Sequence, residues 1–452
     1  MVRGIVLVVL DCVRADHLSC YGYGRETTPT IDALARRGLT WEHAYSTCSW
    51  TKPSVASILT GLYPSQHGVL RGPKRLRGRT GCVTDALPGD CPHVAGEFAR
   101  TGRQCAAFLN NVQLENYTGF NRGFSTYVAD CRGADRQLKA LDDWLATGHA
   151  DDRFFAYLHL MEAHWPYKPR RRHVALFGGD RNTSAFAAYS ARDFSRLRRA
   201  LARGEVTLSA GEREDLIRMY DAAVRRLDGK IKLLLRILEN RGVRDTTAVV
   251  ITADHGEELF DHGGIGHGHS LHVETTHVPL IVSNPIEPAC GRRAEPVSLV
   301  DLPHTLLRLG GVGTVFPGRD VISAGTSASA AYGELSIGRR CLRAIRVGDR
   351  RLHRESTFPR DHDLSPLEFL RGAYRGDTSG HETVRLYDLA ADPGERKDLA
   401  GDPAEASVIE CMTKEMEAAA GPRAGAVQSA ARREVDADEV LVDRLRALGY
   451  IE

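Results

Sequence analysis

Short apolar runs recur through the first three hundred residues and alternate with stretches of helical periodicity. The clearest runs are Gly4–Leu10, Phe154–Leu160, 248–252 and 278–282. Runs of this length with little polar alternation are typical of strands buried on both faces, as in a parallel sheet covered by helices. The pattern therefore predicts an α/β domain with a mostly parallel sheet flanked by helices.

The strongest predicted helix covers residues 220–240, where apolar side chains repeat at three- and four-residue steps. This spacing places them on one helix face, and Gly242 supplies a stop. The apolar run after this helix ends just before Asp254, as the first run of the chain ends just before Asp11. Ligands bind beyond the carboxyl ends of parallel strands, so we expect both aspartates at one binding edge.

The pattern changes after about residue 325. Residues 342–347 and 384–389 read as short strands separated by a polar loop, and the Ala- and Gly-rich segment 418–431 reads as a mobile linker or marginal helix. We therefore expect a catalytic α/β domain over 1–325 and a smaller α+β subdomain over 326–452.

The composition is that of an ordinary globular chain. Of 452 residues, 42% are hydrophobic and 26% are charged, and the formal net charge is +2. So small a basic excess argues against a nucleic-acid polymer as partner. No apolar run is long enough for a transmembrane helix, and the first run lacks a cleavage site. We expect a cytoplasmic protein with no membrane partner, and the oligomeric state stays open.

The ten cysteines show no metal-binding CxxC spacing, and a chain of this size needs no disulfide staples. We therefore expect reduced thiols, which agree with a cytoplasmic location. A bond between Cys82 and Cys91 stays an alternative.

Thr51 lies just before a helix that we expect to begin at Pro53. Free backbone N–H groups and the helix dipole favour negative charge at such a position. They would stabilise an alkoxide at Thr51, more so beside a divalent cation. Thr51 is therefore a candidate nucleophile and metal ligand. The alternative is a simple helix N-cap, a position where Thr is common.

The segment around Thr51 resembles the sulfatase signature, in which Cys-x-Pro-Ser-Arg is followed by Leu-Thr-Gly. Thr51 stands where sulfatases carry the cysteine that becomes formylglycine. Val55 replaces the arginine that supports formylglycine and its ester. The chain thus looks like a sulfatase-fold protein without the sulfatase cofactor.

Three further residues complete a candidate metal site. Asp11 and Asp254 each end a strand, and His255 can present a nitrogen beside the Asp254 oxygen. The segments that carry these residues resemble metal-binding turns of the alkaline phosphatase superfamily. The resemblance implies a divalent ion, Mn, Zn, Mg or Ca, held by Asp11, Thr51, Asp254 and His255. Cys12 replaces a second aspartate of many sulfatases, which favours Mn or Zn over Ca.

Histidines supply the remaining candidate chemistry. The segment 159–167 resembles the family pattern His-x-x-Asp-Pro-His-x-Pro-Tyr, with Glu162 and Ala163 departing from it. His164 would face the leaving group as a donor or general acid. His267 would donate to the transition state, or join Glu162 or His164 in a second metal site. Of the remaining histidines in this region, His262 and His269 are weaker candidates.

Taken together, the motifs resemble the sulfatase family of the alkaline phosphatase superfamily from Ile5 almost to Ile451. The resemblance implies that family's mostly parallel sheet and a small anionic ester as substrate. We expect a metal-dependent hydrolase of phosphate esters, with a phosphodiester as the first candidate substrate, since Thr replaces the formylglycine precursor. Three alternatives stay open: transfer of the phospho group to an alcohol, sulfate-ester hydrolysis without formylglycine, and a non-catalytic metal- or anion-binding protein.

Overall fold

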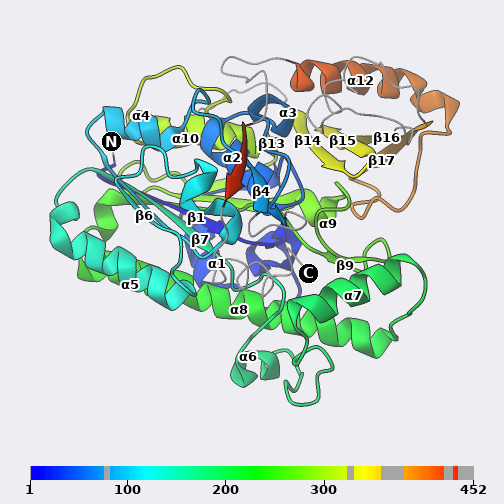
Figure 1. Ribbon diagram of the computed structural model, residues 1–452, viewed down its shortest axis with the longest axis horizontal. Helices are drawn as coiled ribbons and strands as arrows, with labels where there is room; N and C mark the ends of the chain where they lie inside the picture. Colours follow the sequence, from blue (N-terminus) through cyan, green and yellow to red (C-terminus); the bar gives the residue numbers. More distant parts are fainter. Residues whose placement is uncertain (1, 76–81, 323–329, 358–380, 422–430, 436–452) are drawn as a thin grey trace.

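A nine-stranded sheet between two layers of helices forms the larger part of the protein. The computed structural model describes residues 2–75, 82–322, 330–357, 381–421 and 431–435. Figure 1 shows α2, α4 and α10 on one face of the sheet and α5 and α8 on the other. The fold therefore confirms the predicted α/β domain.

The strand order of this sheet is β12-β2-β11-β8-β1-β7-β5-β6, with β13 beside β2. Its strands are β1 (Gly4–Leu10), β2 (Leu39–Tyr45), β5 (Gln104–Phe108), β6 (Thr126–Val128), β7 (Phe154–Leu160), β8 (Thr247–Ala253), β11 (His277–Ser283), β12 (Gly291–Arg293) and β13 (Val297–Ser298). The helices are α1 (Pro29–Arg36), α2 (Thr51–Thr60), α3 (Pro64–His67), α4 (Val94–Arg100), α5 (Ala134–Trp144), α6 (Arg171–Ala175), α7 (Ala191–Ala202), α8 (Ala210–Asn240), α9 (Val273–Thr276) and α10 (Leu302–Leu309).

The register of the central strands sets the position of the candidate site. β1 pairs in parallel with β7 and β8, so that Leu10 lies opposite Leu160 and Ala253. The residues that follow these strands therefore emerge at one edge, as predicted for Asp11 and Asp254.

One strand departs from the predicted parallel pattern. β11 runs antiparallel to β8 and to β2. The segment 254–276 turns at the carboxyl edge, and its only helix is the short α9 (Val273–Thr276). A chain that returns without a crossover helix pairs in the opposite direction, and this explains the antiparallel β11.

Helix α8 begins earlier than the predicted start at residue 220. Its N-terminus carries a capping box in which the Ser209 hydroxyl accepts from the Glu212 N–H and the Glu212 carboxylate accepts from the Ser209 N–H. Farther along, the Tyr220 hydroxyl donates to the Cys12 carbonyl at 2.7 Å and accepts from the Arg14 N–H at 3.0 Å. The helix thereby fixes the turn that follows β1.

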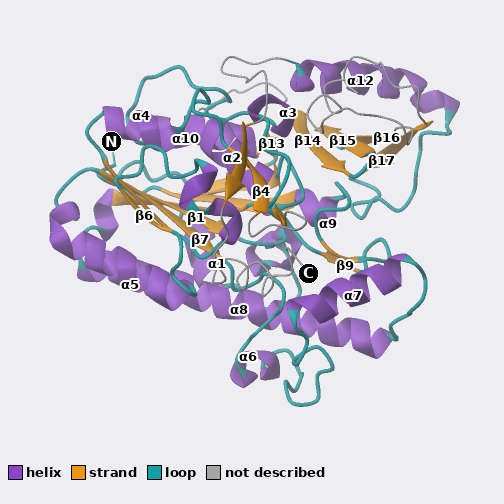
Figure 2. Ribbon diagram, in the orientation of Figure 1, coloured by secondary structure: helices purple, strands orange, loops and turns teal. Residues whose placement is uncertain are grey.

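The C-terminal subdomain is a four-stranded antiparallel sheet covered by one helix (Figure 2). Its elements are β14 (Ala330–Ile337), β15 (Arg340–Val347), β16 (Arg350–Thr357), β17 (His381–Asp388) and α12 (Ala406–Ala420). Leu352 and Leu386 pack with Met412 and Met416 of α12 on one sheet face. The predicted α+β subdomain is confirmed, but the polar loop expected between two strands contains β16, in which Leu352 is the one apolar residue among charged and polar residues.

Two predicted boundaries fall partly outside the described residues. The domain boundary at 325 lies within 323–329, and most of the Ala- and Gly-rich segment lies within 422–430. The described flanks of that segment are regular, since α12 reaches Ala420 and β18 (Ala431–Val435) pairs with β4 (Cys82–Ala86). The chain thus returns to the larger domain after α12.

Buried ion pairs join the C-terminal sheet to the larger domain. Glu395 accepts from the His272 ring at 3.0 Å and the His353 ring at 2.7 Å, and its carboxylate lies 3.3 Å from Nε of Arg351. Arg351 in turn donates to the Leu271 carbonyl at 2.6 Å. Residues of the 254–276 segment are thereby held against β16.

Two expectations about the chain as a whole can be compared with the structure. All ten cysteines are free thiols, so Cys82 and Cys91 form no bond. Within the described ranges, no helix combines the length and the apolar character that a membrane crossing requires.

His262 provides a pH-dependent link across the same interface. Its ring pairs with the Glu274 carboxylate at 2.8 Å and with the Glu395 carbonyl at 3.1 Å. The hydrogen bond to Glu274 is the main cause that raises the pKa of His262 from 6.5 to about 9, against an opposing effect of burial. A raised folded-state pKa stabilises the fold fully below pH 6.5, and this contribution is lost as pH rises through about 9.

We therefore expect the thermal stability of His262→Gln to fall less than that of the native chain between pH 6.5 and 9. Thermal unfolding at a series of pH values measures this slope. Glu274→Gln removes the partner and should flatten the slope in the same way. Equal slopes in the native chain and in both variants would contradict the assignment.

Candidate active site

The four predicted metal ligands lie around one point at the carboxyl edge of the sheet. Nε2 of His255 is 3.3 Å from Oγ1 of Thr51, 3.5 Å from Oδ2 of Asp254 and 3.9 Å from Oδ1 of Asp11. All four side chains are buried. Parallel strands β1 and β8 place the two aspartates, and the N-terminus of α2 brings Thr51 to them.

Helix α2 begins at Thr51 rather than at the predicted Pro53, and Trp50 occupies the N-cap position. The alternative interpretation of Thr51 as an N-cap is therefore wrong. The Thr51 hydroxyl lies in the first turn, where unpaired N–H groups and the helix dipole favour negative charge. The helix is buried along its whole length, so this field is poorly screened by water.

The donor set fits a divalent metal ion. Among the described residues, Oδ2 of Asp254 is buried without a hydrogen-bond partner, while Oδ1 accepts from the backbone N–H groups of Cys12 and His255. Burial and then the nearby Asp11 carboxylate raise the pKa of Asp254 above its ordinary value. A cation between the two carboxylates would relieve this repulsion. When bound, it would polarise an ester oxygen and stabilise an alkoxide.

Two residues that the sequence did not single out hold Asp11 in place. His159 meets Oδ2 of Asp11 through Nε2 at 2.8 Å, and Asn111 donates to the same oxygen at 3.0 Å. The Tyr157 hydroxyl bonds the other ring nitrogen of His159 at 2.8 Å. Such contacts orient a metal ligand and raise its affinity. In the sequence, His159 could be connected with Asp11 only through its position in the 159–167 motif. No sequence pattern pointed to Asn111.

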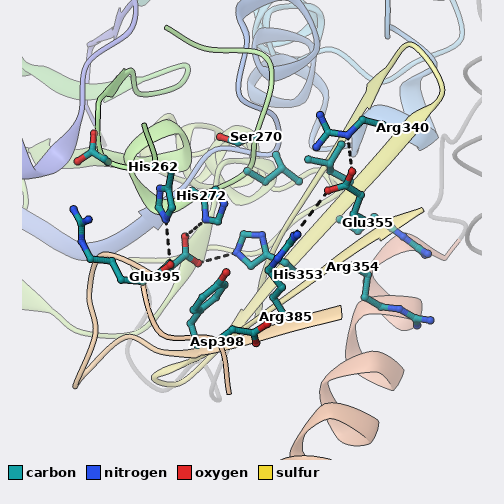
Figure 3. Close-up of a pocket in the computed structure, with 16 residues that line it drawn as sticks. His262, Ser270, His272, Arg340, His353, Arg354, Glu355, Arg385, Glu395 and Asp398 are labelled. Carbon is teal, nitrogen blue, oxygen red and sulfur yellow. Dashed lines mark hydrogen bonds and ion pairs between the residues drawn. The ribbon is translucent and has the colours of Figure 1, made fainter. Parts of the chain in front are cut away.

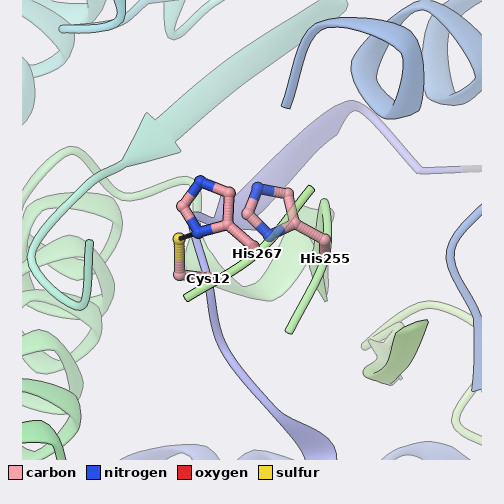
Figure 4. Close-up of side chains that lie close together, drawn as sticks. All are labelled: Cys12, His255 and His267. Carbon is pink, nitrogen blue, oxygen red and sulfur yellow. Dashed lines mark hydrogen bonds between the residues drawn. The ribbon is translucent and has the colours of Figure 1, made fainter. Parts of the chain in front are cut away.

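His267 lies beside His255 and Cys12 (Figure 4). Its ring centroid is 4.5 Å from that of His255 and 5.3 Å from that of His164. Nδ1 of His267 is 3.1 Å from the Glu257 carboxylate and 3.5 Å from Sγ of Cys12. The structure thus brings the three predicted catalytic residues, Thr51, His164 and His267, together with the metal-ligand cluster.

Cys12 has a left-handed backbone, with φ of 61°. This conformation is uncommon outside glycine. It places Sγ 3.1 Å from Oδ1 of Asp11. Burial and then the charge of Asp11 raise the pKa of the Cys12 thiol well above its ordinary value. Without a cation, the thiol therefore stays protonated and donates to Asp11.

The other candidates make contacts away from this cluster. Glu162 accepts from the Ala134 N–H at the start of α5, and His269 pairs with Glu258 at 2.5 Å. His262 lies at the interface with the C-terminal subdomain. Nothing in this arrangement supports the alternative second metal site through Glu162.

Comparison with known proteins agrees with the geometry. The Sulfatase family profile matches residues 3–312. The chain belongs to the sulfatase family. The Delta 4,5-hexuronate-2-O-sulfatase of Bacteroides thetaiotaomicron is 24% identical over 445 residues, which cover 88% of this chain and 85% of the relative. Arylsulfatase A of Homo sapiens is 25% identical over 440 residues, covering 89% and 84%.

The solved phosphonate monoester hydrolase of Agrobacterium radiobacter has a similar fold, with a TM-score of 0.68 at 19% identity over 92% of this chain and 95% of its own. That likeness confirms the alkaline-phosphatase-like architecture. Membership of the sulfatase family makes the chain an enzyme of the sulfate- and phosphate-ester class, in which a divalent metal assists the reaction.

Asp254→Asn tests the metal assignment. The substitution removes one of two neighbouring buried carboxylates. We expect divalent-metal affinity to fall by roughly 10- to 100-fold or more, while the metal-free protein gains roughly 1–3 kcal/mol of stability. Metal titration and thermal unfolding with a chelator measure the two effects.

Asp228→Asn is the matched control, because Asp228 is a buried carboxylate that accepts from the N–H groups of Thr30 and Ile31 at the start of α1. It should lower stability with or without metal and leave metal affinity unchanged. Undiminished metal binding by Asp254→Asn would refute the site.

Proposed function

We propose that the protein hydrolyses phosphate esters, phosphodiesters first, with Thr51 as nucleophile. The observation that carries this proposal is the position of Thr51. Its hydroxyl lies 3.3 Å from His255 at the N-terminus of a buried helix, in the place of the formylglycine precursor. Asp11, Thr51, Asp254 and His255 would hold the metal ion.

In the first half-reaction, the Thr51 hydroxyl releases its proton to solvent and Oγ1 attacks phosphorus. The bond from phosphorus to the ester oxygen breaks as the new bond forms. His164, in its protonated form, gives a proton to the departing oxygen. The products of this step are an alcohol and phosphorylated Thr51, which for a diester substrate still carries the second ester group.

His267 is better suited to the second half-reaction. Burial lowers the pKa of His267 despite the adjacent Glu257 carboxylate. The ionised Glu257 accepts a hydrogen bond, so the proton of neutral His267 resides on Nδ1 and Nε2 is free to accept. A water that attacks phospho-Thr51 can give its proton to Nε2. The Thr51 oxygen then leaves and is protonated, and a phosphate monoester is released from a diester substrate, or phosphate from a monoester.

The choice of phosphorus rests on what Thr51 lacks. A formylglycine hydrate carries two hydroxyl groups, and the second allows sulfate to leave by elimination. Thr51 has one hydroxyl, so a sulfated threonine requires direct attack by water. Phospho-Thr51 is also released by direct attack of water, and a bound metal ion would polarise a phosphoryl oxygen for that displacement. Transfer to an alcohol would use the same intermediate with a different acceptor.

Sulfate-ester hydrolysis is the second candidate function. It is favoured by the curated relatives, a Delta 4,5-hexuronate-2-O-sulfatase and an arylsulfatase. Because formylglycine is absent, we expect slow turnover of a sulfate ester by this chain.

Turnover of nitrophenyl phosphate monoesters and diesters, a phosphonate ester and nitrophenyl sulfate tests the proposal, with Mn, Zn, Mg or Ca added. We expect Thr51→Ala to lose at least roughly 10³-fold in kcat/KM on the preferred phosphorus ester. Thr51→Ser keeps the hydroxyl and should retain part of the activity. Mass spectrometry after acid quenching should detect phospho-Thr51.

Thr40→Ala is the control for loss of a buried threonine hydroxyl, since Oγ1 of Thr40 in β2 has no hydrogen-bond partner among the described residues. Its activity should match that of the native chain. Full activity of Thr51→Ala would overturn the nucleophile, and a preference for nitrophenyl sulfate would put the second candidate first.

A further inference from the structure

A cavity of about 640 Å³ lies between the C-terminal sheet and the larger domain (Figure 3). Strands β15, β16 and β17 form one wall, and parts of the segments 261–272 and 395–398 form the others. Its charged lining includes Arg340, Arg385, Arg396 and Glu355. No step of the proposed reaction uses these residues.

The strand register explains why this wall is polar. His353 lies opposite Arg385 across β16 and β17, and Leu342 lies opposite Glu355 across β15 and β16. Leu352, between His353 and Arg351 in sequence, points to the other face and packs against α12. Because side chains alternate along a strand, the charged row is directed into the cavity.

Positive charge exceeds the negative charge available in this wall. Arg340 and Arg385 share one carboxylate, since Glu355 lies 2.5 Å from Nε of Arg340 and 3.9 Å from Nη1 of Arg385. Arg396 is exposed, and no ion pair with another described residue is seen for its side chain. One guanidinium charge of the Arg340–Arg385 pair and that of Arg396 are therefore not balanced by a carboxylate and can bind a ligand.

The other carboxylates of the lining are already engaged. Asp261 pairs with Arg14 at 2.6 Å, and Asp398 accepts from the Leu386 N–H at 3.0 Å. Glu395 accepts from His272, His353 and a backbone N–H. The cavity thus offers guanidinium donors that suit an oxyanion.

A metal ion is a poorer fit to the same wall. His272, His353 and Glu395 bring possible ligand atoms within 4.8 Å of one another. However, the Arg351 guanidinium already lies 3.3 Å from Glu395. A second cation there would be repelled by a buried positive charge.

The cavity lies within reach of an ester bound at Thr51. Only two residues lie between His267, at the metal-ligand cluster, and Ser270 in the cavity wall, so the Cα atoms of His267 and Ser270 are at most about 11 Å apart. Trp50, which precedes Thr51, packs with Leu271 and Leu342 of the cavity wall. One packed apolar cluster therefore contacts both the segment that carries Thr51 and the cavity wall.

We propose that this cavity binds a second anionic group of the ester substrate, with Arg340, Arg385 and Arg396 as donors. The proposal rests on the proposed ester hydrolysis and defines its substrate class as an ester that carries another phosphate, sulfate or carboxylate on the part that is not cleaved. Arginine forks bind such groups through paired hydrogen bonds.

Calorimetric binding in the Thr51→Ala background tests this site without any chemistry. The probes are glucose 1,6-bisphosphate and glucose 1-phosphate, which differ by one phosphate. We expect the bisphosphate to bind roughly 10-fold more tightly. The double variant Arg385→Gln with Arg396→Gln should abolish this advantage, whereas Glu355→Gln, which releases two arginines, should increase it.

Arg350→Gln is the matched control, because Arg350 lies in β16 of the same sheet but pairs with Asp388 at 3.0 Å. It should keep the bisphosphate advantage. An advantage that is absent in the background protein, or that survives unchanged in the double variant and in Glu355→Gln, would overturn the cavity as an anion site.

Failure of the cavity and failure of the nucleophile remain distinct. If Thr51→Ala keeps full turnover while the bisphosphate advantage depends on Arg385 and Arg396, the nucleophile is wrong and the cavity stands. If Thr51 is required for turnover but the advantage does not depend on the arginines, the cavity is wrong and the proposed reaction stands.

Discussion

The structure depends on two buried carboxylates that emerge from parallel strands at the same edge. Asp11 and Asp254 would repel each other, and the surrounding contacts are arranged to hold them there. Asn111 and His159 bond Asp11, while two backbone N–H groups bond Asp254. Buried charge of this kind is tolerated when it is paired or binds a metal. The strand order of the sheet places both aspartates at one edge, and the start of α2 places Thr51 beside them.

Around that cluster, the segment 254–276 contacts both parts of the protein. It carries His255 and His267 toward Thr51, and its far end carries His272 toward Glu395 of the C-terminal subdomain. The subdomain is thereby held through buried ion pairs, and one of its sheet faces is packed on α12. Its other face is left to line the cavity. The segment 254–276 therefore carries residues of the candidate active site and residues of the proposed substrate-binding cavity.

Much of this could be predicted from the sequence, and the exceptions share a cause. Strands Gly4–Leu10 and Phe154–Leu160 were evident because buried strands are continuously apolar. β16 was missed because its charged sequence does not look like a strand. Its role is clear only once one face of the sheet is seen to pack on α12 and the other to line the cavity. Asp11 and Asp254 follow strands and were predicted as ligands. The contact between Asn111 and Asp11 depends on the order of strands in the sheet, which one sequence does not reveal. The antiparallel direction of β11 could not be predicted for the same reason.

The wall of the cavity has a consequence for how such enzymes diversify. Arg340 and Arg385 project from strands whose opposite face is fixed by α12, and neither contacts Asp11, Asp254 or Thr51 among the interactions described. Changes of charge in this row can therefore accumulate without disturbing the reacting atoms. A lineage with this architecture can exchange one ester for another by drift in the C-terminal strands, while the ancestral chemistry at the sheet edge is inherited intact.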